Sequence, residues 1–203
     1  LSNAANWAPD GASITSGSTV TPLAGDRLII NGGNINAGGV VNIGAGAELV
    51  QAATGQHVYS SQVQLAGTGT DGNGAFKNNG NDWANMTDVK VTGDATAFVN
   101  SGGWRHDSHG GAVNQFDLNG KTLTVRGGNN WYFVNTNVIG TGVLDVSIGG
   151  EFNFEANAVL PAGMTMRLSN NTRSSSWDGA GKIMSGDVQI VDRGILENRQ
   201  NDG

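Results

Sequence analysis

Segments in which apolar and polar residues alternate return along the chain at intervals of about 21 residues, and this recurrence limits the folds open to it. Alternation places every second side chain on one face of a β-strand. Equivalent apolar positions recur at close to this interval in four pairs: Leu28 and Leu49, Leu123 and Leu144, Leu144 and Met164, and Met166 and Val188. Such a period, built from strands and turns, predicts a solenoid whose coils bury one continuous apolar core.

Helical patterning is nearly missing, because no stretch of twelve or more residues has apolar positions at the helical spacing. The 33 glycines and 24 asparagines instead predict frequent turns, since both residues tolerate positive φ. Asparagines of successive coils are expected to stack into ladders of side-chain amides. The segments expected to form strands are 26–31, 40–51, 58–67, 87–93, 115–127, 142–157, 164–170 and 187–198.

We therefore predict one all-β domain over residues 1–203, a right-handed parallel β-helix of about nine coils with 20–24 residues each. Glycine-rich loops are expected to interrupt it between Ala66 and Trp83 and between Ser101 and Val113. The alternative is an antiparallel jelly-roll sandwich, because it too has many short strands and the "NG" pair at 119–120 is a hairpin signal. The C-terminal "LENRQNDG" has no capping element, which predicts either a fragment of a longer protein or end-to-end self-association.

Composition and charge argue against several classes of function. The net charge is −6, and the 11 Lys and Arg residues are scattered singly, so binding to nucleic acid is not expected. No stretch approaches the roughly 20 apolar residues of a membrane-spanning helix. Cysteine is absent, which excludes a thiolate metal site, and no cofactor is expected.

Two stretches contain the phrases of a known repeat: "GTGTDGNGAFKNNGNDWANMTDVKVTGDATAFVNSGGW" at 67–104 and "DLNGKTLTVRGGNNWYFVNTNV" at 117–138. The matching phrases lie at Gly72–Gly80, Val89–Asp94 and Asp117–Thr124. In these the chain resembles the autotransporter-associated β-strand repeat proteins of bacterial surfaces. The resemblance implies an extracellular or cell-surface right-handed β-helix that serves as a stalk, an adhesin or a glycan-associated module. It transfers no catalytic residue, and the chain departs from the family pattern by inserting "RHDSHGGAVNQ" at 105–115.

The inserted segment and the residues beside it form the best candidate for a ligand-binding site. Aromatic planes stack on sugar rings, and Arg, Asp and Asn side chains bond to sugar hydroxyls. Trp83 and Tyr132 also lie in or beside Gly- and Asn-rich loops. The candidate binding residues are Trp104, Arg105, His106, Asp107, His109 and Trp131. Two alternatives stay open: a metal site at His106, Asp107 and His109, and a solvated loop whose histidines bond to backbone or water.

The predicted function is that of a non-catalytic structural or adhesive module, whose expected partners are glycans or host and cell-surface components. The alternative is a carbohydrate-active enzyme, a polysaccharide lyase or glycoside hydrolase with its site on one face of the β-helix. A glycoside hydrolase needs two paired carboxylates, for example Asp145 with Glu151 or Asp117. Because no group of acidic residues recurs one coil apart, the non-catalytic module is favoured. A coil-to-coil pair of carboxylates in a groove would favour the enzyme.

Overall fold

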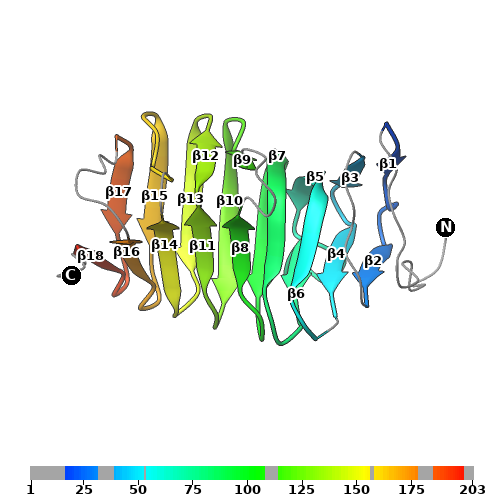
Figure 1. Cartoon of the computed structure of the whole chain (residues 1–203), viewed down its shortest axis with the longest axis horizontal. Helices are drawn as coiled ribbons and strands as arrows, with labels where there is room; N and C mark the ends of the chain where they lie inside the picture. Colours follow the sequence, from blue (N-terminus) through cyan, green and yellow to red (C-terminus); the bar gives the residue numbers. More distant parts are fainter. Residues whose placement is uncertain are drawn as a thin grey trace.

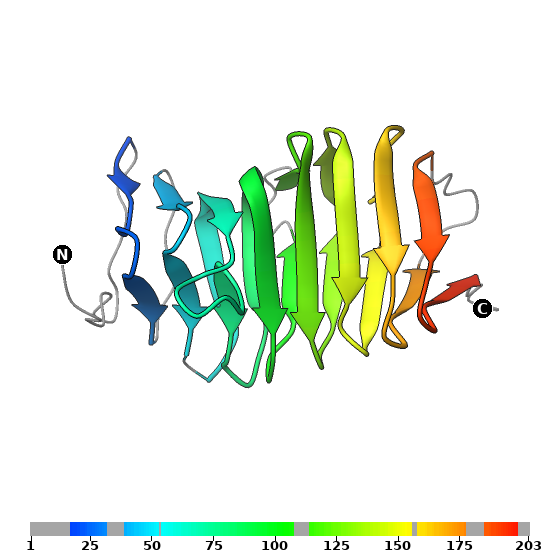
Figure 2. The same ribbon diagram turned by 180° about the vertical axis from the view of Figure 1, so that it is seen from behind.

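The computed structural model describes residues 17–31, 39–52, 54–107, 114–155, 158–177 and 185–198, which form 18 β-strands and no helix. The strands stack side by side along the long axis of the molecule, with β1 and β2 at one end and β17 and β18 at the other (Figures 1 and 2). Their bounds are β1 (Thr19–Val20), β2 (Arg27–Ile30), β3 (Val40–Ile43), β4 (Glu48–Gln51), β5 (His57–Gly67), β6 (Phe76–Asn78), β7 (Ala84–Val99), β8 (Trp104–Asp107), β9 (Asn114–Asp117), β10 (Lys121–Gly127), β11 (Trp131–Val134), β12 (Thr136–Ile139), β13 (Gly142–Ser147), β14 (Glu151–Glu155), β15 (Met164–Leu168), β16 (Arg173–Trp177), β17 (Asp187–Ile190) and β18 (Ile195–Asn198).

The strands form three columns, and each coil of the chain contributes to the columns in turn. Column 1 contains β2, β4, β6, the last part of β7, β10, β13, β15 and β17. Column 2 contains the first parts of β5 and β7, then β8, β11, β14, β16 and β18. Column 3 contains β1, β3, the second part of β5, the middle of β7, β9 and β12. Long strands such as β7 bend through all three columns.

The parallel solenoid is confirmed, and the jelly roll is excluded. Every pairing between the named strands is parallel, and the antiparallel contact among the described residues is an isolated bridge between Ser169 and Arg193. The "NG" pair does form a tight turn, with φ of 51° at Asn119 and 74° at Gly120. This turn leads from β9 in column 3 to β10 in column 1, so it makes a corner of the coil rather than a hairpin.

One row of inward side chains runs through every strand of column 1 and forms a continuous part of the core. Its members occupy equivalent positions in the register: Leu28, Leu49, Phe76, Ala97, Val125, Val146, Leu168 and Ile190. All except Ile190 are buried. The predicted pairs Leu28 with Leu49 and Leu123 with Leu144 are confirmed. Leu144 pairs with Met166 instead of Met164. This is a shift of two residues along the strand, so the same face of the strand stays buried.

The solenoid makes about seven turns, fewer than the nine predicted. Column 1 has eight strands, and two of its coils are longer than expected because they contain insertions. One long coil runs from Leu49 to its register partner Phe76, and the other runs from Ala97 to Val125. The insertions lie where interrupting loops were predicted, and they account for part of the difference in the number of coils.

Asparagine side chains connect neighbouring coils by donating hydrogen bonds to backbone carbonyl oxygens, and not by stacking on one another. The Nδ2 of Asn78 donates to the carbonyl oxygens of Gly103 and Asp82 at 2.7 and 2.9 Å. The Nδ2 of Asn129 donates to the carbonyl oxygen of Ser101 at 2.8 Å. The expected stacking of amide on amide is wrong for these two residues, because the backbone groups at coil corners need partners of their own.

We expect the Leu144→Ala substitution to lower the free energy of unfolding by about 2 to 5 kcal/mol. Leu144 is fully buried in β13, between Leu123 and Met166, so truncation leaves a cavity in the middle of the stack. Chemical denaturation followed by circular dichroism measures the change. The Leu23→Ala substitution is the control, because Leu23 is 61% exposed. Equal stability of the two variants would contradict the inward assignment of Leu144.

Candidate functional site

The predicted binding loop begins with a strand, and the alternation of that strand divides the candidate residues between two faces. In β8, Trp104 and His106 point into the solenoid and are fully buried, whereas Arg105 and Asp107 point outward and are partly exposed. Trp131, in β11, pairs in register with Trp104 and is also fully buried. Three of the six candidates are therefore core residues.

The buried rings of column 2 form two aromatic ladders that run along the solenoid axis. In the first, Trp104 stacks on Trp131 with a centroid distance of 5.1 Å, and Trp131 stacks on Phe152 at 4.6 Å. In the second, His106 stacks on Phe133 at 4.9 Å, and Phe133 is followed by Phe154 at 5.3 Å. The centroid distances are close to the roughly 4.8 Å spacing of neighbouring strands, so the parallel register itself places the rings in contact.

His106 is held in its neutral form inside this ladder. Its Nδ1 donates a hydrogen bond to the carbonyl oxygen of Met86 at 3.1 Å. Burial lowers the pKa of His106 from 6.5 to about 3, because the charged imidazolium would lose its hydration. The hydrogen bond to Met86 opposes this shift only in part.

The sugar-binding role expected for Trp104, His106 and Trp131 is not available in this fold, since none of the three reaches the surface. The same burial removes His106 from any surface metal site, and His109 lies outside the described residues. No group of three or more His, Asp or Glu residues that could hold a metal ion occurs within the described ranges. The expectation that these side chains are exposed assumed a loop at residues 104–107. The segment is a strand, and the alternation of a strand turns every second side chain into the core.

Arg105 and Asp107 remain at the surface, beside two aromatic residues. Their side chains form an ion pair with 3.2 Å between Nη2 and Oδ2. In the neighbouring strand of column 2, the hydroxyl of Tyr132 donates to Glu151 Oε2 at 3.0 Å, and the ring of Tyr132 contacts that of Trp83 at 5.1 Å. Burial and the Glu151 carboxylate together raise the pKa of Tyr132, so the phenol stays protonated. This face offers a partly exposed aromatic pair.

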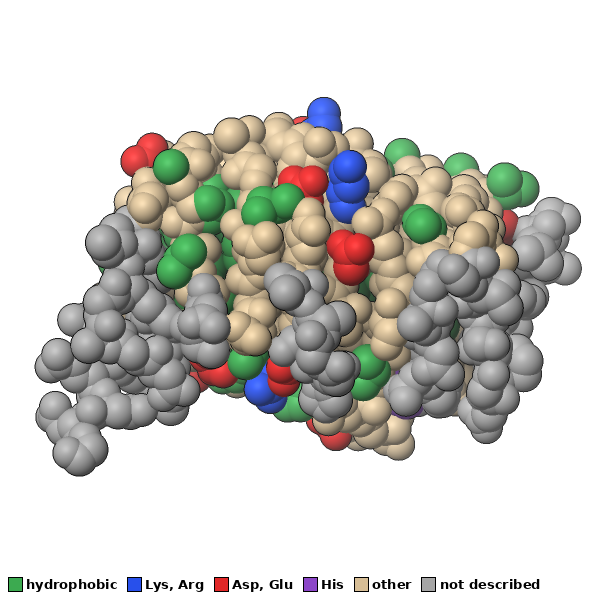
Figure 3. Space-filling model, turned by 45° about the horizontal axis from the view of Figure 1, so that its top comes forward, with side chains coloured by type: hydrophobic (Ala, Val, Ile, Leu, Met, Phe, Trp, Pro, Cys, Tyr) green, Lys and Arg blue, Asp and Glu red, His purple; other side chains and the backbone are tan. Residues whose placement is uncertain are grey.

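The carboxylates considered for an enzyme are not brought together. Asp145 lies in β13 of column 1, Glu151 in β14 of column 2 and Asp117 in β9 of column 3. Asp145 also faces Arg167 at 3.9 Å. On the face shown in Figure 3, charged side chains are few among the described residues, and acidic and basic ones lie side by side near its centre.

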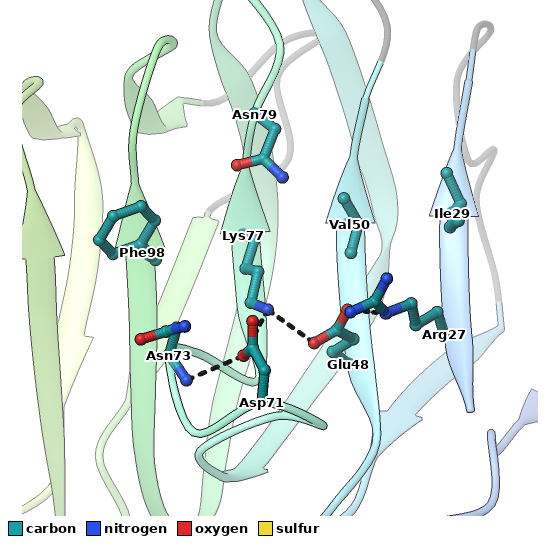
Figure 4. Close-up of a pocket in the computed structure, with 9 residues that line it drawn as sticks. All are labelled: Arg27, Ile29, Glu48, Val50, Asp71, Asn73, Lys77, Asn79 and Phe98. Carbon is teal, nitrogen blue, oxygen red and sulfur yellow. Dashed lines mark hydrogen bonds and ion pairs between the residues drawn. The ribbon is translucent and has the colours of Figure 1, made fainter. Parts of the chain in front are cut away.

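A hollow of about 340 Å³ lies on the outward face of column 1, near the N-terminal end of the stack (Figure 4). Its floor is a row of four side chains in register across β2, β4, β6 and β7: Ile29, Val50, Lys77 and Phe98. The loop before β6 borders one side with Asp71 and Asn73, and Asn79 borders the opposite side (Figure 4). Arg27 and Glu48 complete the lining.

Four charged side chains form a network along the hollow. Glu48 is 1% exposed and accepts from Lys77 Nζ at 2.8 Å, while its other carboxylate oxygen contacts Arg27 Nε. Lys77 is 7% exposed and also contacts Asp71 at 2.6 Å. The hydroxyl of Thr70 donates to Glu48 at 2.8 Å. The two positive and two negative charges of the network balance, and neither Glu48 nor Lys77 is buried without a partner of opposite charge.

The loop between β5 and β6 is closed tightly over this network. Gly69 has φ of 81°, and a Cβ at this position would lie 2.1 Å from the carbonyl oxygen of Gly74. Glycine is therefore required where the two arms of the loop meet. The contacts of Thr70 and Asp71 hold the loop to Glu48 and Lys77, so its conformation depends on the sheet beneath it.

Asp71 is held as a carboxylate. The hydrogen bond from Lys77 is the largest cause of its lowered pKa, and the backbone N–H of Asn73, 3.0 Å from Oδ1, lowers it further. A carboxyl group in this state accepts hydrogen bonds from a ligand but does not donate a proton near neutral pH.

The residues of the hollow were missed by sequence reasoning, although one signal for them exists. Arg27 and Glu48 have opposite charges, and their separation along the chain is one period of the repeat. The break in the repeat between Ala66 and Trp83 indicated a loop there, but not that its Asp71 would reach back to Lys77.

Comparison with known proteins found no matching family model, curated protein or solved structure. The described residues contain no helix long and apolar enough to cross a membrane.

We expect the unfolding free energy of this protein to depend on His106 between pH 6.5 and pH 3. The unfolded chain binds a proton at His106 below about pH 6.5, whereas the folded chain does so only near pH 3, so acid favours unfolding in this window. The slope reaches about 1.4 kcal/mol per pH unit. Denaturation across this range should show a shallower slope for His106→Leu than for the parent. Parallel curves would contradict the buried neutral state.

We expect Lys77→Met to destabilise the fold by about 3 to 5 kcal/mol, because it leaves Glu48 buried with one fewer cation. The double variant Glu48→Leu with Lys77→Met should lose less, since both buried charges are then gone. Arg193→Met is the control, because the pair of Arg193 with Asp192 is exposed and contributes little. A double variant less stable than Lys77→Met alone would contradict the coupling of these two charges.

Proposed function

We propose that the chain is a non-catalytic structural and adhesive module of an exported surface protein, and that it binds glycans in the hollow. The hollow carries this proposal, because its floor contains the apolar side chains of Ile29, Val50 and Phe98 beside the ion-paired Lys77, and its border is polar. Placement outside the cell rests on the resemblance to autotransporter-associated repeats and on the absence of cysteine.

The lining of the hollow suits a sugar ring. The half-buried ring of Phe98 provides an apolar surface for the C–H face of a pyranose, and the outward row that contains it continues through Lys77 to Val50 and Ile29. The exposed amides of Asn73 and Asn79 border this surface on opposite sides and can donate to and accept from hydroxyl groups. Flat apolar contact and hydrogen bonds at the edge are thus offered together.

The charge balance of the hollow favours neutral sugars over acidic ones. Lys77 contacts two carboxylates, and Arg27 contacts Glu48, so both cations already have anionic partners. A sulfated or uronic sugar would have to compete with Glu48 and Asp71 for them. A neutral hexose meets no such competition and can use the exposed carboxylate of Asp71 as an acceptor.

The second candidate function, a carbohydrate-active enzyme, is favoured by one observation. Glu48 and Asp71 come from neighbouring coils and share the ammonium group of Lys77 in the hollow. Acid–base hydrolysis of a glycoside needs one protonated carboxyl group, however, and the lowered pKa of Asp71 does not fit that role. Binding without cleavage is therefore the better supported function.

A glycan array probed with the purified 203-residue chain tests the proposal. We expect binding to neutral oligosaccharides in preference to sulfated or uronic ones. Phe98→Ala should weaken the binding of any hit by about tenfold in a calorimetric titration, since it removes the aromatic contact. Tyr132→Ala, at a partly exposed aromatic residue of column 2, is the matched control and should leave the affinity unchanged.

Absence of binding to every glycan, or binding that depends on Tyr132 and not on Phe98, would overturn the assignment to the hollow. Each glycan that binds is then incubated with the protein, and its mass is followed to detect cleavage. Cleavage that disappears in Asp71→Asn would establish the enzyme instead.

A further inference from the structure

Lys77 contacts two carboxylates in the hollow, and the three side chains together carry the groups that amide formation requires. Its Nζ lies 2.6 Å from Oδ1 of Asp71 and 2.8 Å from Oε2 of Glu48 (Figure 4). Since a carboxyl C–O bond is about 1.2 Å long, Nζ lies within about 4 Å of the carboxyl carbon of Asp71. Reacting atoms in a productive geometry are about 3 to 3.5 Å apart, so only a small displacement separates the amine from this carbon.

The surroundings of the amine shield it from water and make its charge costly. Lys77 and Glu48 are both buried, and Val50 and Phe98 flank Lys77 in the outward row of column 1. A buried ammonium group is tolerated only while it is paired, whereas a neutral amide loses much less hydration. Asp71 is exposed, so a water molecule released from its carboxyl group can leave into solvent. The site therefore favours a reaction that removes the charge of Lys77.

The hydrogen bonds favour Asp71 over Glu48 as the carboxyl group that reacts. Glu48 contacts Arg27 Nε and accepts from the N–H and hydroxyl of Thr70 at 3.3 and 2.8 Å, which hold it beside the amine. It is thus placed to accept a proton from Nζ. The backbone N–H of Asn73 lies 3.0 Å from Oδ1 of Asp71. A donor at this place stabilises the negative charge that collects on a carboxyl oxygen when an amine adds to its carbon.

We propose that Lys77 and Asp71 condense into an intramolecular amide bond, with Glu48 as the proton relay. Glu48 takes a proton from the Lys77 ammonium, and the neutral amine then adds to the carboxyl carbon of Asp71. Two of the three ammonium protons end on one oxygen of Asp71, which leaves as water, and the third stays on the amide nitrogen. One N–C bond forms and one C–O bond breaks, so no oxidant, reductant or further reactant is needed.

The first proton transfer also removes the group that keeps Asp71 ionised. The hydrogen bond from Lys77 is the largest cause of the lowered pKa of Asp71, so loss of the ammonium allows this carboxyl group to take up a proton. One positive and one negative charge disappear together, and Glu48 keeps Arg27 as its partner. The carbonyl oxygen of the amide still accepts hydrogen bonds, so the inference does not rest on glycan binding in the hollow.

Mass spectrometry of the 203-residue chain tests the proposal without any ligand. After incubation of the folded protein at neutral pH, we expect a mass that is lower than the sequence mass by one water molecule. Trypsin should then fail to cleave the denatured chain after Lys77, because the ammonium group is lost. Cleavage after Lys90 in the same digest is the internal control. The full sequence mass together with cleavage after Lys77 would overturn the proposal.

Glu48→Gln tests the proton relay, because it keeps both reacting residues. We expect this variant to retain its full sequence mass, and circular dichroism shows whether it is folded. Asp71→Ala changes an exposed loop residue instead of a buried one and should also retain its full mass. Loss of water in folded Glu48→Gln would contradict the relay, and loss of water in Asp71→Ala would contradict the assignment of the reacting carboxyl group.

Ring closure between the Asp71 side chain and the backbone nitrogen of Gly72 would also release one water molecule. Lys77→Arg separates the two reactions, because arginine keeps the positive charge but has no amine that can condense. We expect Lys77→Arg to retain its full sequence mass. Loss of water that persists in this variant would place the reaction at Gly72 and would contradict the amide bond with Lys77.

Discussion

The parallel pairing of each coil with the next is the interaction on which the rest of the structure depends. It places the same position of successive coils in contact, so an apolar residue that returns once per coil adds to an existing row. The row from Leu28 to Leu168 and the ladder from Trp104 to Phe152 are two results of this one constraint. Each coil is stabilised by its neighbours, because no single coil has enough apolar surface to bury by itself.

The same constraint explains how the hollow is assembled. The inward residues of a coil must stay apolar to fill the core, whereas its outward residues can be charged and can differ in size. Arg27, Glu48 and Lys77 lie far apart along the chain, yet the register brings them together on one face. Because Glu48 and Lys77 are buried there, their charges require each other, and the loop that carries Asp71 is fixed by the same contacts.

Much of the fold could be predicted from alternation and period, because these patterns record directly which side chains face the core. The pairing of Leu123 with Leu144 follows from counting alone. The prediction of the candidate binding residues was wrong where a strand was interpreted as a loop. In β8, apolar and polar residues alternate over only four positions, and the neighbouring glycines and charged residues favoured a loop. The contact of Asp71 with Lys77 could not be predicted, since it depends on how the loop closes at Gly69 and Gly74.

The insertion before β6 leaves the register of column 1 intact: the chain departs after β5, passes over the outer surface and resumes with Phe76 directly beside Leu49. In the function that we propose, part of the binding site is therefore carried by a segment whose replacement does not require the scaffold to be redesigned. Evolution can exchange such a segment for another of different length, and a protein engineer can graft a new one between the same two anchor points.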